Sequence, residues 1–123
     1  MTSTKLISLR KISCWRCGTL FLADIAPGEN IFFCPNCKGV NIVLVDSRLG
    51  VRGIYKPSES DALTNPVIDV SKIKLKNEDL VPKTLQPYLS TIKALINGDL
   101  KKLDKHTLIA LQALIDCGVV VIE

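Results

Sequence analysis

Short apolar runs separated by turn residues occupy the first half of the chain, a pattern typical of β-strands. The runs are found at residues 19–23, 30–33 and 41–45. The sequence Ala-Pro-Gly-Glu at residues 26–29 separates the first two runs and predicts a tight turn between them. Residues 1–13 carry four aliphatic side chains and predict a further strand or arm. We therefore expect a small antiparallel β unit over residues 1–49.

The next segment, residues 50–70, is rich in glycine, proline, serine and asparagine. These residue types mark turns and interruptions of regular structure. The segment therefore predicts a linker between the β unit and the second half of the chain.

The second half of the chain changes to the spacing of three and four residues that characterises amphipathic helices. One apolar stripe covers residues 87–97 and another covers residues 105–117, and each is followed by a glycine. Asp104 stands where it can cap the second helix, and the β-branched run at 119–122 predicts a strand. Residues 71–123 therefore predict a helical unit with a terminal strand, which places the chain in the α+β class.

The composition is that of a folded protein. Hydrophobic residues make up 47% of the 123 residues, and 13 Ile, 17 Leu and 10 Val supply enough aliphatic surface for a core. This balance excludes a wholly disordered chain. No run approaches the roughly 20 apolar residues of a membrane span, and the first ten residues lack an apolar signal core. We expect a protein with no membrane partner that is not secreted and resides in the cytoplasm, or in the nucleus of a eukaryotic cell.

Positive charge is concentrated in the first half of the chain. The net charge is +4; residues 1–60 hold eight basic and four acidic side chains, whereas residues 61–123 hold eight of each. Such an excess favours a polyanionic partner. The basic residues that we expect to contact phosphates are Arg16, Lys38, Arg48 and Arg52. The alternative is that these four side chains form only a hydrated surface.

Four of the five cysteines form two Cys-x-x-Cys pairs separated by sixteen residues. The pairs are Cys14 with Cys17 and Cys34 with Cys37. Two residues between thiolates allow a tight turn to direct both sulfur atoms at one point, and Gly18 and Gly39 are expected to supply the unusual backbone angles. A hairpin between the pairs would bring them together as a closed four-sulfur site, which suits zinc at about 2.3 Å from each sulfur. We expect one zinc ion per chain.

Three other uses of these cysteines compete with zinc. A redox-active pair normally stands alone at the start of a helix, and neither pair precedes a predicted helix. Two disulfides need an oxidising compartment, which the missing signal core argues against. Iron can also be held by four thiolates, so a rubredoxin-like electron carrier stays open as an alternative.

Residues 10–48 resemble a zinc ribbon, the module of transcription factors, small RNA polymerase subunits and several ribosomal proteins. The resemblance rests on Cys-x-x-Cys-Gly, a hairpin with Pro-Gly, the aromatic pair Phe32-Phe33, and Cys-Pro-x-Cys followed by a strand. The segment is most similar to the small zinc-ribbon subunit of archaeal and eukaryotic RNA polymerases. The resemblance implies a ribbon fold, a bound metal and a partner that is nucleic acid or a nucleoprotein assembly of the RNA polymerase type.

The chain departs from that subunit in three respects. It continues well beyond the ribbon, it lacks the Asp-Glu pair that transcript-cleavage factors carry at a hairpin tip, and it has Lys38 where glycine is usual. RNA cleavage is therefore not implied. Residues 103–123 resemble the last helix and first wing strand of a winged-helix domain, with a plain helical pair as the alternative.

Nothing in the sequence predicts catalysis. His106 is the only histidine, and it would lie roughly 16 Å from Cys117 along one helix, so the two cannot share a proton. We expect Cys117 to be a small buried group at the helix end. We therefore expect a non-enzymatic protein that binds nucleic acid or a component of the transcription or translation machinery. The alternative is a protein–protein adaptor whose zinc only stabilises the fold, with the C-terminal helices as a surface for a partner or for self-association.

Overall fold

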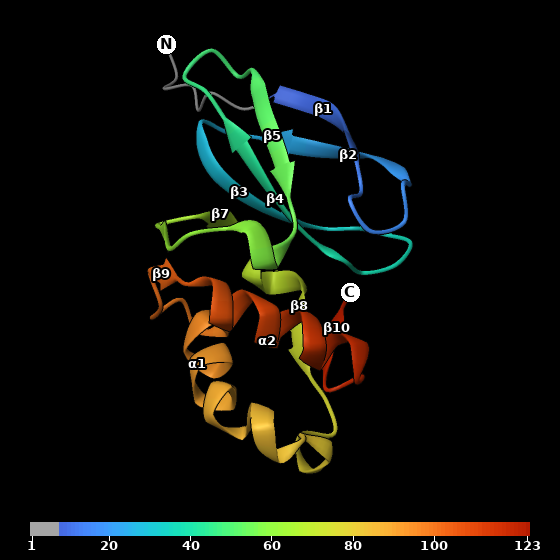
Figure 1. Ribbon diagram of the computed structural model, residues 1–123, viewed down its shortest axis with the longest axis vertical. Helices are drawn as coiled ribbons and strands as arrows, with labels where there is room; N and C mark the ends of the chain where they lie inside the picture. Colours follow the sequence, from blue (N-terminus) through green and yellow to red (C-terminus); the bar gives the residue numbers. More distant parts are fainter. Residues whose placement is uncertain (1–7) are drawn as a thin grey trace.

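The computed structural model describes residues 8–123, which contain ten β-strands and two α-helices (Figure 1). The strands are β1 Ser8–Ser13, β2 Leu20–Ile25, β3 Gly28–Phe33, β4 Val40–Val45, β5 Val51–Tyr55, β6 Leu63–Thr64, β7 Val67–Ile68, β8 Ile73–Leu75, β9 Lys102–Leu103 and β10 Val120–Ile122. The helices are α1 Gln86–Ile96 and α2 Lys105–Asp116. This content confirms the α+β class. The first part of the strand or arm predicted over residues 1–13 lies outside the described residues.

The first four strands form two antiparallel hairpins. β1 pairs with β2 over six residue pairs, and β3 pairs with β4 over six more. β2 and β3 follow one another in the chain but belong to different sheets. The expectation of a hairpin between the two cysteine pairs is therefore wrong. Each cysteine pair instead forms the tip of its own hairpin, because the cysteine turn itself closes the two strands that flank it.

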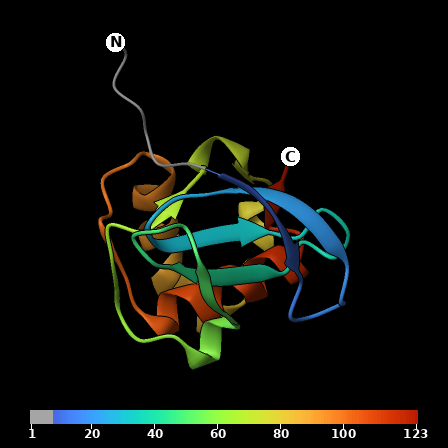
Figure 2. The same cartoon turned by 90° about the horizontal axis from the view of Figure 1, so that it is seen from above.

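β4 runs through the middle of the molecule and is buried on both faces, which explains its nearly unbroken apolar sequence. Its Val40 and Ile42 pack with the helices, whereas Val43 and Val45 pack with the β1–β2 hairpin. Figures 1 and 2 show the resulting layers: the hairpin on one side, the sheet β5-β4-β3-β7 in the middle and the helices on the other side. The molecule therefore has an apolar core on each side of its central sheet.

Residues 50–70, expected to be a linker, contribute two strands to that sheet. β5 pairs antiparallel with β4, and the short β7 pairs in parallel with β3. Within β5, Gly53 leaves room for the ring of Tyr55, since a Cβ atom there would lie 2.6 Å from the Tyr55 hydroxyl oxygen. At least one glycine of this segment, Gly53, is therefore needed within a strand and not in a turn. The division of the chain into a β unit over residues 1–49, a linker over residues 50–70 and a helical unit over residues 71–123 stays a prediction.

Both predicted helices and the terminal strand are confirmed close to their expected bounds. Asp104 caps α2, because its Oδ1 accepts the Thr107 backbone N–H over 2.7 Å. Leu108, Leu111 and Leu114 of α2 are fully buried, and β10 pairs antiparallel with β8. The likeness to a winged helix stays a prediction. Within residues 8–123, neither helix is long and apolar enough to cross a membrane.

Candidate metal centre

The two cysteine turns have the same backbone hydrogen bonds, shifted by twenty residues. In the first turn, the Gly18 N–H donates to the Cys14 carbonyl over 3.0 Å, and the Cys14 N–H donates to the Thr19 carbonyl over 2.9 Å. In the second, Lys38, Cys34 and Gly39 repeat this pattern at 2.9 and 3.0 Å. The strand pairings on either side repeat with the same shift. The chain therefore builds one structural unit twice, and each copy presents two sulfur atoms.

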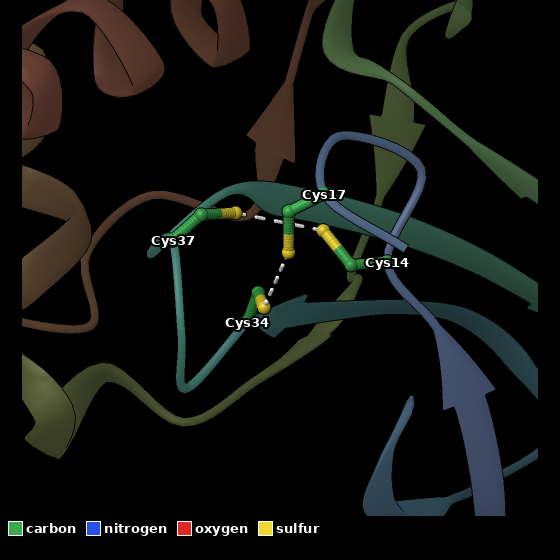
Figure 3. A group of neighbouring side chains, drawn as sticks. All are labelled: Cys14, Cys17, Cys34 and Cys37. Carbon is green, nitrogen blue, oxygen red and sulfur yellow. Dashed lines mark hydrogen bonds between the residues drawn. The ribbon is translucent and has the colours of Figure 1, made fainter. Parts of the chain in front are cut away.

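The four sulfur atoms meet where the two hairpin tips face each other (Figure 3). All four lie within 4.8 Å of one another, and the two contacts between hairpins, Cys14 to Cys37 and Cys17 to Cys34, each measure 3.6 Å. A tetrahedral ion with metal–sulfur bonds of about 2.3 Å has sulfur–sulfur edges of about 3.8 Å. The cluster therefore matches the size of a four-thiolate metal site. Its contacts are much longer than the roughly 2.05 Å of a disulfide bond.

Hydrogen-bond donors point at the sulfur atoms, as thiolates require. The backbone donors are Arg16 N–H to Cys14 Sγ at 3.4 Å, Asn36 N–H to Cys34 Sγ at 3.4 Å and Gly39 N–H to Cys37 Sγ at 3.3 Å. A side-chain donor, Asn41 Nδ2, lies 3.5 Å from Cys14 Sγ. Asn41 is fully buried, and its Oδ1 accepts the Trp15 backbone N–H over 3.0 Å. It therefore links the first cysteine turn to β4 in the second hairpin.

The cysteine thiols differ in their proton affinity. Hydrogen bonding to Thr19, whose hydroxyl oxygen lies 3.1 Å from the sulfur, lowers the pKa of Cys17 to about 5. Burial raises the pKa of Cys37 to about 12. Burial also opposes ionisation of Cys14, but hydrogen bonds from Asn41 and the turn backbone outweigh it and lower the pKa of this thiol. Because metals bind the thiolate form, binding has to displace the proton most firmly held at Cys37.

The residue with a positive φ after the second cysteine pair is not the glycine that the sequence predicted. Gly18 has a φ of +77°, as expected, but in the second turn the positive φ of 61° belongs to Lys38. Gly39 is needed for a different reason. A Cβ atom there would lie 3.1 Å from Cys37 Sγ and 3.3 Å from Arg16 Cδ, so a side chain would press on a ligand.

The cysteine cluster is joined to the helical layer through α2. The Val40 backbone N–H, next to the second cysteine turn, donates to Gln112 Oε1 over 2.6 Å. The Arg16 guanidinium, in the first cysteine turn, forms a 2.8 Å ion pair with Asp116. Trp15 donates its indole N–H to the Val40 carbonyl over 2.6 Å and lies half-exposed beside α2. The cysteine turns therefore contact both the β layers and the helix.

The four basic residues predicted to contact phosphates fall into two separate pairs. Arg16 and Lys38 lie in the cysteine turns, whereas Arg48 and Arg52 lie at or beside the turn between β4 and β5. The six residues of β4 separate the two pairs by roughly 20 Å. Arg16 is engaged with Asp116, and Arg52 forms a 3.0 Å ion pair with Asp46. Among residues 8–123, the ion pairs include neither Lys38 nor Arg48.

The fifth cysteine does not belong to the cluster. Cys117 caps the C-terminal end of α2 and is exposed, so the expectation of a buried side chain is wrong. Cys117 follows the last residue of the apolar stripe of α2, so its side chain lies at the surface and not in the core.

The chain has no significant match among protein-family models, among curated protein sequences or among solved structures. The candidate metal centre therefore rests on the geometry of the four cysteines alone. The spacing of the cysteines does not reveal two residues that support this candidate centre, Asn41 and Gln112. Asn41 did leave a signal, because it is a lone polar residue at the start of an apolar strand. Gln112 left none, since a glutamine on a helix surface is ordinary.

Proposed function

We propose that the cysteine cluster holds one zinc ion and that this ion has a structural role. The observation that carries the proposal is the close approach of four sulfur atoms from two hairpin tips, all within 4.8 Å. Four protein thiolates complete a tetrahedral zinc shell and leave no position for a substrate or a reactive water. A site of this kind supplies folding energy and no catalysis, which agrees with the expectation of a non-enzymatic protein.

The zinc proposal is tested by metal analysis of the purified chain. We expect about one zinc per chain, a loss of zinc in Cys34→Ser, and full retention in Cys117→Ser, which removes an exposed thiol outside the cluster. A chain that carries iron would be coloured, and this outcome would replace zinc with the electron-carrier alternative. Retention of zinc in Cys34→Ser would overturn the four-cysteine assignment.

The proposed structural role makes a separate prediction about metal removal. Each hairpin would contribute two ligands. The apolar core under the β1–β2 hairpin is small, because the hairpin supplies only three buried side chains to it: Ile12, Ala23 and Ile25. Zinc can contribute roughly 10 kcal/mol or more to folding in small domains. Chelation should therefore loosen residues 8–45 first while the helices persist. Hydrogen exchange that rises equally in all parts of the chain would contradict this order.

For the partner, we propose nucleic acid or a component of the transcription or translation machinery. The support is the positive excess in residues 1–60 and the position of Lys38 and Arg48 outside the ion pairs of the described residues. Four thiolates with one Zn²⁺ lower the net charge of the chain from +4 to +2, so binding has to rely on local groups. Binding of this kind is weak and has little sequence preference.

A salt titration with duplex and single-stranded oligonucleotides tests this proposal. If Lys38 and Arg48 each neutralise a phosphate, the logarithm of the affinity falls with the logarithm of salt concentration with a slope of about −1.8, and of about −3 to −4 if Arg16 and Arg52 also participate. Lys38→Ala with Arg48→Ala should remove about two contacts without changing zinc content. An affinity independent of salt, or no binding near 50 mM salt, would favour the adaptor alternative.

The adaptor alternative is supported by a different observation. Leu9, Leu20 and Leu22 on the β1–β2 hairpin are exposed by 56, 65 and 60%. Clustered apolar side chains on a surface are typical of protein interfaces. The two candidates are separable, because salt weakens phosphate contacts far more than it weakens contacts between leucine side chains.

A further inference from the structure

The β1–β2 hairpin has one buried face and one exposed face. Side chains alternate between the faces along each strand, as in any β-strand. The buried face contacts the central sheet through Ile12, Ala23 and Ile25. The exposed face, which we call the outer face, consists of Leu9, Lys11, Ser13, Leu20, Leu22 and Asp24. Three of its six members are thus leucines in positions where a hydrated strand normally carries polar residues.

We propose that the outer face binds the outer face of a second copy of this chain. The choice of partner rests on the charges. Lys11 and Asp24 are the charged members of the face, so the face as a whole is neutral and does not favour a polyanion. Among residues 8–123, the ion pairs include neither of the two. A surface with one cation and one anion can be complementary to itself, which a two-fold symmetric interface requires.

The strand register shows how two copies would fit. Leu9 lies directly opposite Asp24, and Lys11 lies directly opposite Leu22. The two leucines therefore occupy one diagonal of this four-residue patch, and the two charges occupy the other. A two-fold axis along the leucine diagonal would place each leucine on its own counterpart. The same rotation would bring each Lys11 close to the Asp24 of the other copy.

Such an axis makes the two hairpins cross steeply, which is one of the two common ways for β layers to pack. Leu20, the first residue of β2, lies on the same face two positions before Leu22 and extends the apolar contact. Leu9 and Leu22 also border a groove of about 340 Å³ that Phe32 and Val67 line from the central sheet. The groove extends the surface beside the two leucines that a second copy can contact. The hairpin lies on the opposite side of the sheet from the helices (Figure 1), so α1 and α2 do not obstruct this contact.

Sedimentation equilibrium of the full chain over about 10 µM to 1 mM tests the proposal, since an interface of this limited size is expected to be weak. The expected result is an equilibrium between the 13.5 kDa chain and a dimer. Leu9→Ser with Leu22→Ser should raise the dimer dissociation constant about tenfold or more. Leu80→Ser is the matched control, because Leu80 is 62% exposed but lies away from the hairpin, and it should change nothing.

A charge exchange tests the two-fold arrangement itself. Lys11→Glu alone, or Asp24→Lys alone, places like charges opposite each other and should weaken the dimer several-fold. The double variant restores opposite charges and should return the dissociation constant to the wild-type value. Metal content and the circular dichroism spectrum of every variant verify that the fold is intact. A monomer throughout the concentration range, or a dimer that neither the leucine nor the charge variants alter, would overturn the proposal.

Discussion

Gln112 on α2 accepts the backbone N–H of Val40 on β4 over 2.6 Å, although the two residues lie 72 positions apart in the chain. Val40 is fully buried and lies immediately after the second cysteine turn. A second contact, the ion pair between Arg16 and Asp116, joins the first cysteine turn to the same helix. The two contacts join different β layers to the same helix and differ in their expected strength.

Gln112→Ala should lower the free energy of unfolding by about 1–3 kcal/mol, because it leaves a buried N–H without an acceptor. Asp116→Asn should lower it by less than about 1 kcal/mol, since the side chains of its ion pair are 35% and 44% exposed. Chemical denaturation of both variants, with zinc loading held equal, measures the difference. A larger loss in Asp116→Asn would show that the ion pair is the stronger attachment.

Asn41→Leu should reduce both metal affinity and stability. The leucine has the same number and branching of side-chain heavy atoms but cannot donate to Cys14 Sγ or accept the Trp15 N–H. Removing such a supporting partner typically lowers metal affinity about 10- to 100-fold, and the unpaired N–H costs about 1–3 kcal/mol. Competition with a zinc chelator measures the affinity. Asn30→Leu is the control, because Asn30 is equally buried but holds the 26–28 turn. It should destabilise the chain without the loss of metal affinity.

Lys38→Gly should raise the free energy of unfolding by up to about 1 kcal/mol, because glycine adopts a positive φ without the penalty that lysine carries. Lys38→Ala keeps the penalty and should give no such increase. The pair also separates conformation from charge: both variants should weaken any nucleic-acid binding equally. Thermal unfolding and the salt titration together provide the measurement. Equal stability of the two variants would mean that the turn carries no strain at this position.

Asp104→Ala should destabilise the chain by about 1 kcal/mol near neutral pH through loss of the α2 cap. Hydrogen bonds from Thr107 lower the pKa of Asp104. The ionised cap therefore stabilises the fold above the unfolded-state value of about 3.9, and the contribution is lost as the pH falls through the lowered pKa. The difference between wild type and Asp104→Ala should shrink on acidification. Asp104→Asn keeps a neutral cap and should not show this dependence when urea unfolding is compared at several pH values.

Local patterns in the sequence predicted several parts of the structure. The apolar stripes of α1 and α2, the Asp104 cap and the strand after α2 depend on neighbouring residues and were predicted near their actual bounds. The set of four cysteines was also evident from spacing, and their sulfur atoms do converge. Features of this kind need no knowledge of distant contacts.

Other features depended on contacts that spacing does not reveal. The turn at 26–28 lies between two sheets rather than within a hairpin, because each cysteine turn already closes its own strand pair. β5 forms in a segment with turn residues because the edge of β4 is available to it. Gln112 and Asp116 bind Val40 and Arg16, which lie 72 and 100 positions earlier in the chain. Helix periodicity predicts only that these two side chains lie on the polar side of α2.

The duplication of the cysteine turn has a consequence for the order in which the chain becomes structured during synthesis. Each turn closes with hydrogen bonds between residues at most five positions apart, so the first half of the ligand set is ready once residue 19 has left the ribosome. The second half is ready once residue 39 follows, long before Gln112 and Asp116 exist. A nascent chain that binds the proposed zinc ion can therefore do so before the helix has been made, and α2 would then fold against hairpin tips that are already held together.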